Sequence, residues 1–186
     1  MPRESRWCSK SLAITRFATL RNALLALFAI LAALCAAQAE AQEAREGASG
    51  LPVPRFVSLK TAPVNLRGGP GQDHEVRWVY VRKDLPLEII AEYDVWRRVR
   101  DASGTTCWIH KQMLDGQRTA LIVGEGNAAL REAPLADAGI VAYGAPGLVA
   151  QLDECGEAWC RIEAKGYAGW VERARIFGIL AGETIR

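Results

Sequence analysis

The feature that most constrains this chain is a sequence pattern that occurs twice. Each copy has a Leu-Arg opening, a proline three residues later, a β-rich stretch, a tryptophan, and a second tryptophan followed by a β-branched residue. The corresponding positions are Arg67 and Arg131, Pro70 and Pro134, Trp96 and Trp159, and Trp108 and Trp170. The offset between the copies stays between 61 and 64 residues. A repeat of this period indicates one structural unit used twice.

Short strands fill each copy. In VRWVYV, the alternation places Val76, Trp78 and Tyr80 on one face, and in WRRVRD, Trp96 and Arg98 share a face. Turn sequences rich in glycine, such as GGPG, DASG and AKGYAG, separate these strands. No sustained 3.6-residue period is found after the N-terminal leader. The pattern predicts an all-β fold, with a small β-barrel or sandwich in each copy.

The first 41 residues are typical of a secretory signal peptide. Arg16 and Arg21 precede an apolar run from Ala23 to Ala37, and small residues follow it. This run is shorter than the roughly 20 residues that span a bilayer. We expect cleavage after Ala39 or Ala41, a periplasmic or secreted protein, and no stable membrane span after cleavage. An uncleaved anchor is the alternative, and a lipoprotein signal at Cys35 is disfavoured by the leucine before it.

The charge of the chain depends on this leader. Residues 1–41 hold five of the 23 basic and two of the 21 acidic residues, so residues 42–186 have a net charge of −1. Nucleic-acid binding normally needs a basic surface, and we therefore expect no nucleic-acid partner. The arginines and lysines of 82–100 are interleaved with acidic residues. This interleaving indicates charged residues on solvated strands rather than a basic patch that binds an anionic partner.

The first copy resembles a known family over nearly its whole length. The motifs VNLRGGPG, LEIIAEY, WRRVRD and CWIH are similar to those of the bacterial SH3 (SH3b) domain, and the second copy matches more loosely. A glycine usually precedes the closing tryptophan, where the first copy has Cys107. The resemblance implies an exported proteobacterial protein with two tandem SH3-like small β-barrels. We assign residues 55–118 and 119–186 to them, after a flexible lead-in at 42–54.

Two cysteines flank a short connection in the second copy. In a hairpin around GEAW, Cys155 and Cys160 face each other at disulfide distance. The oxidising compartment that an exported protein enters permits this bond. We favour a disulfide over two reduced thiols or a pair of metal ligands. The repeat aligns Cys155 with Glu92 and Cys160 with Arg97. We therefore predict that Glu92 and Arg97 also face each other, as an opposite-charge pair.

Catalytic signals are weak. Cys107 and His110 are three residues apart on one expected strand, so their side chains point to opposite faces and do not form a nucleophile–base pair. The glycine-rich segment RGGPGQDHE lacks the spacing of a phosphate-binding loop. His74 has no Ser/His/Asp arrangement around it. We expect no enzyme, no catalytic residue, no metal site and no cofactor.

Aromatic side chains are the best candidates for binding. The candidate ligand-binding residues are Trp78, Tyr80, Trp96 and Arg98, since SH3-like barrels bind peptides in grooves lined by aromatic residues. A small barrel also needs large side chains for packing. For Trp78, Tyr80 and Trp96 both roles remain open, whereas the recurrence of Trp108 and Trp170 favours a structural role.

These observations lead to a functional hypothesis. We expect a non-catalytic binding module that recognises peptidoglycan or a periplasmic peptide or protein. The alternative is a structural or assembly partner of another envelope protein, with no wall binding of its own. The apolar segment QRTALIV between the copies is expected to complete a sheet.

Overall fold

The computed structural model describes residues 45–186. The predicted signal peptide, residues 1–41, lies outside this range. Within the described residues there is no α-helix, and none of their helical turns is long and apolar enough to cross a membrane. Two seven-stranded antiparallel sheets that share no strand contain most of these residues. The predicted all-β class and tandem arrangement are confirmed.

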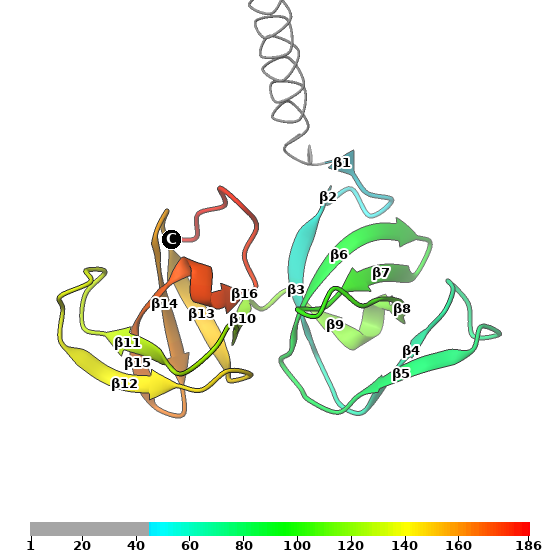
Figure 1. Ribbon diagram of the computed structural model, residues 1–186. Helices are drawn as coiled ribbons and strands as arrows, with labels where there is room; N and C mark the ends of the chain where they lie inside the picture. The colour runs from blue at the N-terminus through cyan, green and yellow to red at the C-terminus, as the bar shows by residue number, and fades with distance from the viewer. Residues whose placement is uncertain (1–44) are drawn as a thin grey trace, which may run out of the picture. The chain divides into compact units, whose positions relative to one another are not determined.

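The first sheet forms a small, partly open barrel with the strand order β5-β4-β8-β7-β6-β3-β9 (Figure 1). Its elements are β3 (Arg55–Leu59), β4 (Val64–Arg67), β5 (Val76–Tyr80), β6 (Pro86–Tyr93), β7 (Trp96–Arg100), β8 (Thr106–His110), the 3₁₀ turn η1 (Lys111–Met113) and β9 (Leu114–Asp115).

The second sheet has the order β12-β11-β15-β14-β13-β10-β16, which is the same order one repeat later. Its elements are β10 (Thr119–Ile122), β11 (Ala128–Arg131), β12 (Ile140–Gly144), β13 (Val149–Cys155), β14 (Trp159–Ala164), β15 (Tyr167–Glu172), η2 (Arg173–Arg175) and β16 (Ile176–Phe177). The segment between the copies forms β10, which pairs with β13 and β16 and so completes a sheet, as expected.

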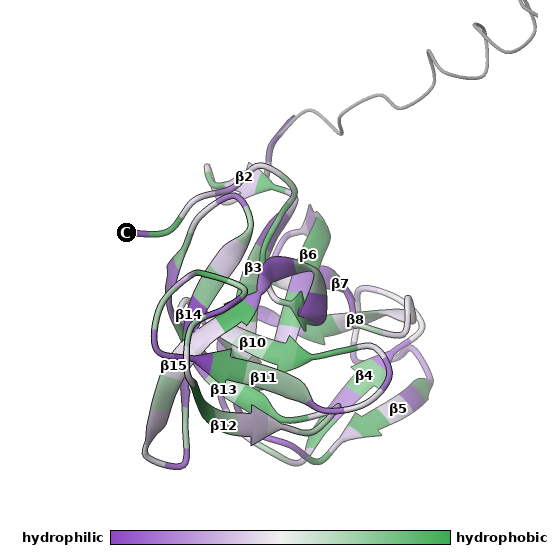
Figure 2. Cartoon of the chain, turned by 60° about the vertical axis from the view of Figure 1, so that its left-hand side comes forward, coloured by the Kyte–Doolittle hydropathy of each residue, from purple (hydrophilic) through white to green (hydrophobic). Residues whose placement is uncertain are grey.

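Each barrel has its own core, built from the alternating inward residues of its strands. The first core contains Leu59, Leu66, Leu87, Ile89, Val99 and Ile109 among others. The second contains the equivalent Ile122, Leu130, Ala150, Leu152, Ile162 and Val171. Figure 2 shows hydrophobic residues along β10, β11 and β13. The repeat detected in the sequence is therefore a repeat of core positions.

The described part of the predicted lead-in, from Arg45 onward, forms a hairpin in the structure. Its strands are β1 (Arg45–Glu46) and β2 (Pro52–Val53). At the turn between them, the Ser49 amide donates to Glu92 Oε2 at 2.7 Å and its hydroxyl to Oε1 at 2.9 Å. A buried carboxylate needs donors, and Ser49 supplies two of them. The sequence prediction did not include this contact.

The predicted pairing of Glu92 with Arg97 is confirmed. The two residues are cross-strand partners on β6 and β7, with Arg97 Nε 3.1 Å from Glu92 Oε1. Arg55 Nη2 lies 2.6 Å from the same oxygen. Burial alone would raise the pKa of Glu92, but hydrogen bonds from Arg55 and Ser49 lower it below its usual value. The Glu92 side chain is 1% exposed and that of Arg97 6%, so the pair is largely dry.

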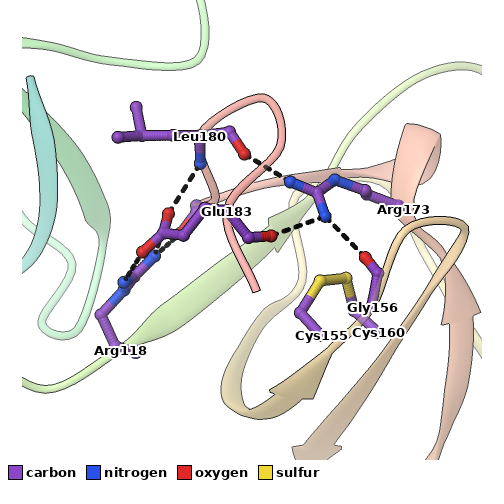
Figure 3. Close-up of a disulfide and its surroundings, with 8 residues drawn as sticks. Arg118, Cys155, Gly156, Cys160, Arg173, Leu180 and Glu183 are labelled. Carbon is purple, nitrogen blue, oxygen red and sulfur yellow. Dashed lines mark hydrogen bonds and ion pairs between the residues drawn. A yellow bond between two sulfur atoms is a disulfide. The ribbon is translucent and has the colours of Figure 1, made fainter. Parts of the chain in front are cut away.

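A disulfide joins the equivalent positions of the second barrel, Cys155 and Cys160. The C-terminal tail covers this end of β13, because the backbone of Ile185 pairs with that of Cys155. Arg173 fixes the tail by donating to the carbonyl oxygens of Gly156, Leu180 and Glu183 (Figure 3). Both barrels therefore brace the same hairpin end, each with different chemistry.

Candidate functional site

Two of the predicted binding residues, Trp78 and Tyr80, lie on the edge strand β5. They are in register with Leu66 and Val64 of β4, whose side chains are buried in the core. Trp78 is nevertheless 55% exposed, because β5 is the last strand of the sheet and has a neighbour on one side only. Trp78 is thus available to solvent, whereas Tyr80 packs against the core.

Tyr80 connects β5 to the turn between β7 and β8. Its hydroxyl donates to Asp101 Oδ2 at 2.6 Å. The other oxygen of Asp101 accepts from Ser103 and from the Thr105 amide, which shapes the turn. Burial and the bond to Asp101 raise the pKa of Tyr80 far above its usual value. Burial would raise the pKa of Asp101, but these donors lower it. The contacts of Tyr80 are those of a structural brace.

The third candidate, Trp96, is 8% exposed and forms part of a groove on the outer face of the first barrel. It is the cross-strand partner of His110, and the two rings meet edge-to-face with centroids 5.5 Å apart. Cross-strand partners project to the same face of a sheet, so the indole and the imidazole form a continuous surface.

The groove follows the seam between β4 and β8. These strands are in register at only one pair, Arg67 with Trp108, before they diverge. The opening has a volume of about 480 Å³. Its lining residues are Pro63, Val64, Asn65, Arg67, Gln72, Trp96, His110, Gln112 and Met113.

The fourth candidate, Arg98, does not line this groove. It is exposed on β7, in register with Trp108, and its guanidinium lies 3.5 Å from the Thr106 hydroxyl. Trp108 thus lies between Arg67 and Arg98 on the outer face of the sheet. Only Trp96 of the four predicted binding residues lines the groove.

A smaller groove lies at the same place in the second barrel. Trp159 and Arg131 occupy the positions of Trp96 and Arg67, and the volume is about 190 Å³. Its lining residues are Asn127, Ala128, Ala129, Arg131, Trp159, Val171, Glu172 and Arg175. By the register of β14 and β15, Glu172 replaces His110. The geometry recurs, but the polar side chains differ.

Cys107 is the remaining group with nucleophilic chemistry. It is 3% exposed, lies in the core of the first barrel, and has its pKa raised by burial. His110 faces the groove on the opposite side of the sheet, as the strand alternation predicts. Within residues 45–186, no group of three His, Cys, Asp or Glu side chains is arranged to hold a metal ion.

Sequence reasoning did not identify Arg67 or His110 as candidates. Arg67 was recognised only as part of the repeated motif, in which it recurs as Arg131. His110 requires the register of β7 with β8, which pairs it with Trp96. That register is not evident from local sequence, because it depends on the length of the intervening turn.

The fold and these grooves define a class, namely tandem small β-barrels with an exposed groove on the outer face. Two regions, residues 60–116 and 124–178, match the model of the family described as Bacterial SH3 domain. Together they cover more than half of the chain, and the chain belongs to this family. No curated protein matches the chain.

Solved structures with a similar chain include two proteins from Trichomonas vaginalis, NlpC2 and NlpC1. The sequence identities are 17% and 18%, and the TM-score is 0.30 in both cases. The matches cover 67% and 72% of this chain, respectively, and 48% of each of those proteins. This chain therefore spans about half of their length.

Proposed function

We propose that this chain is an exported, non-catalytic binding module that recognises peptide components of the cell wall through the groove of its first barrel. The observation that supports this proposal is the groove at Trp96 and His110, where an aromatic floor is bordered by polar side chains. Peptide-binding sites combine an apolar surface with a few polar groups that fix orientation. Bacterial SH3 domains are commonly binding modules, which agrees with this role.

The buried state of Cys107 supports the non-catalytic part of the proposal. A catalytic cysteine needs an accessible thiolate, and burial raises the pKa of this thiol. The nearest imidazole along β8 faces outward, away from the core that holds the thiol. The pair does not meet the geometric requirement for an activated nucleophile.

Co-sedimentation of the purified protein with isolated sacculi tests the proposal. We expect the wild-type protein to sediment with the sacculi and His110→Glu, which introduces the residue of the second barrel, to remain largely in solution. Glu172→Gln is the matched control in the second groove and should sediment like the wild type. A correctly folded wild-type protein that stays in solution would reject wall binding.

A second candidate function is assembly with another envelope protein. The edge strands β5 and β12 favour it, because each exposes apolar side chains on a strand with one neighbour: Val76, Trp78 and Val79 on β5, and Ile140, Val141 and Tyr143 on β12. Such edges accept an added strand. A complex in envelope extracts that forms without sacculi and is lost on Val79→Lys, but retained on His110→Glu, would favour this role.

A further inference from the structure

The charge of the first groove distinguishes it from the second. Among its lining residues there is no Asp or Glu, and Arg67 is the one permanently charged side chain. Asn65, Gln72 and Gln112 add amide groups, and His110 adds an imidazole. A groove with donors and one fixed positive charge is complementary to an anionic acceptor rather than to an amine.

Arg67 is held in place by its own loop. Its Nη1 donates to the carbonyl oxygen of His74 at 2.6 Å, across the turn between β4 and β5. Among the described residues, its other N–H groups have no hydrogen-bond partner. The guanidinium fork has five donors and binds a carboxylate through two parallel hydrogen bonds. One anchored nitrogen therefore leaves an oriented pair of donors for a ligand.

His110 adds a further donor. The backbone amide of Gln112 donates to His110 Nδ1 at 3.3 Å, which places the proton of the neutral ring on Nε2. The edge-to-face contact with Trp96 fixes the plane of this ring. Arg67 and His110 line the same groove, with the indole as its apolar floor.

We propose that the groove of the first barrel binds the free carboxylate of a short peptide, with Arg67 as the anchor and His110 as a second donor. This inference rests on the proposed function and narrows it, since it states which chemical group of the wall peptide is recognised. The apolar part of the peptide chain packs against Trp96.

The second barrel lacks this site despite the same strand order. Glu172 replaces His110 in the second groove. The negative charge of the Glu172 carboxylate would repel the carboxylate of an anionic ligand. Arg175, at the position of Met113, is committed to the carbonyl oxygens of Val123, Glu125 and Gly126. Within residues 45–186, the two barrels therefore have grooves at equivalent positions, and only the first groove has the residues of the carboxylate site.

Isothermal titration with two forms of one synthetic wall-type tetrapeptide tests this inference. One form has free carboxylates and the other has them converted to amides. We expect the free acid to bind with one site per chain and Arg67→Gln to weaken it by about ten- to hundredfold, as for a lost charge-assisted hydrogen bond. The amide form should bind weakly to the wild type and be insensitive to Arg67→Gln.

Arg131→Gln is the matched control. Arg131 occupies the equivalent position and likewise donates to a loop carbonyl, that of Ala138, at 2.8 Å. Its loss affects a loop in the same way as the loss of Arg67, but it should leave affinity unchanged. Equal affinity for acid and amide, equal effects of the two substitutions, or two sites per chain would each overturn the inference. Sacculus binding that persists with equal acid and amide affinity would retain the proposed function and reject the carboxylate site alone.

Discussion

The two barrels share a strand order and a hydrophobic pattern, yet they fasten the same hairpin end by different means. In the first barrel, Glu92 and Arg97 form a dry ion pair covered by an N-terminal hairpin. In the second, a disulfide joins Cys155 and Cys160 and is covered by the C-terminal tail. The two barrels thus have a brace at the same position of the fold, but the chemical groups that form it differ. In both barrels the braced cross-strand pair lies beside the turn of the hairpin, and an ion pair or a covalent bond joins the two strands there.

An arginine at the start of each barrel shows the same divergence: Arg55 is the first residue of β3, and Arg118 directly precedes β10. Arg55 pairs with Glu92 of its own sheet, whereas the equivalent Arg118 pairs with Glu183 of the tail. Burial would raise the pKa of Glu183, but hydrogen bonds from Arg118 and the Leu180 amide lower it. In the second barrel the disulfide occupies the position of Glu92, and Arg118 pairs with a residue outside the sheet.

The largest expected effect follows removal of Glu92. The substitution Glu92→Ala leaves Arg97 and Arg55 without their buried partner and should destabilise the first barrel by about 3–5 kcal/mol. Hydrogen exchange in increasing urea measures this loss for each barrel separately. Asp153→Asn is the control, because it breaks an exposed pair with Arg161 and should cost less than about 1 kcal/mol. Equal losses for the two variants would contradict a special role for the first pair.

Removal of the disulfide should have a smaller effect. The bond closes a loop of few residues, so Cys155→Ser with Cys160→Ser should cost the second barrel about 2 kcal/mol. The same hydrogen-exchange measurement should show the first barrel unchanged. Reduction of the wild-type protein should reproduce the effect, because Cys107, the other cysteine among residues 45–186, is not disulfide-bonded. A loss of protection in both barrels would show that the two braces are coupled.

A fall in pH should affect the stability of the two barrels differently, without any substitution. The pKa of Glu92 is lower in the folded state than its usual value, so its stabilisation is present above about pH 4.3 and is lost as the pH falls through the folded pKa. Asp101 behaves in the same way. The disulfide does not titrate, and in the second barrel the acid-sensitive group is Glu183 of the tail.

Between about pH 6 and pH 3 we therefore expect the first barrel to lose more stability than the sheet of the second. Amide exchange measured across this range checks the expectation. In Glu92→Ala the acid sensitivity of the first barrel should be reduced to the part due to Asp101. An equal acid sensitivity of both sheets would indicate that the Glu92 cluster does not control the first barrel.

The position of Tyr80 offers a milder test of the same comparison. Tyr80→Phe removes the bond to Asp101 and should cost the first barrel about 1 kcal/mol. The equivalent residue in the second barrel is Gly144, where an added Cβ would lie 2.2 Å from Ile122 Cδ1. The tyrosine brace is thus specific to the first copy. Urea denaturation measures the change, and titration with the tetrapeptide should show unaltered affinity.

Much of the fold could be predicted from two sequence patterns, the repeat and the local alternation of apolar residues. The pairing of Glu92 with Arg97 follows from aligning one copy with the other. The strand alternation and the sheet-forming segment at Thr119–Ile122 follow from local patterns of apolar residues. Trp96 was a binding candidate because SH3-like barrels bind peptides in grooves lined by aromatic residues. The same reasoning missed the contact between Ser49 and Glu92, since the two residues are 43 positions apart and the hairpin that contains Ser49 lies outside the repeated unit.

The groove was less accessible to sequence reasoning for a related reason. Arg67, Trp96 and His110 come from three strands, and their side chains meet only through the registers of β4, β7 and β8. Trp78 was more conspicuous as a candidate, because an aromatic residue in an alternating strand is visible locally. The position of an aromatic residue in an alternating strand and its membership of a groove are separate properties, and the sequence displays only the first.

The smallest expected effect concerns Trp78 itself. The second barrel has Ala142 at this position, paired with Leu130 as Trp78 is paired with Leu66. Since that barrel forms the same hairpin without the indole, Trp78→Ala should change stability by no more than about 0.5 kcal/mol. It should also leave tetrapeptide affinity unaltered, because Trp78 does not line the groove. Titration and urea denaturation of the same sample check both statements. A large loss of affinity in a fully stable variant would indicate that the peptide binds on β5 rather than in the groove. The functional difference between the barrels would then lie in their edge strands.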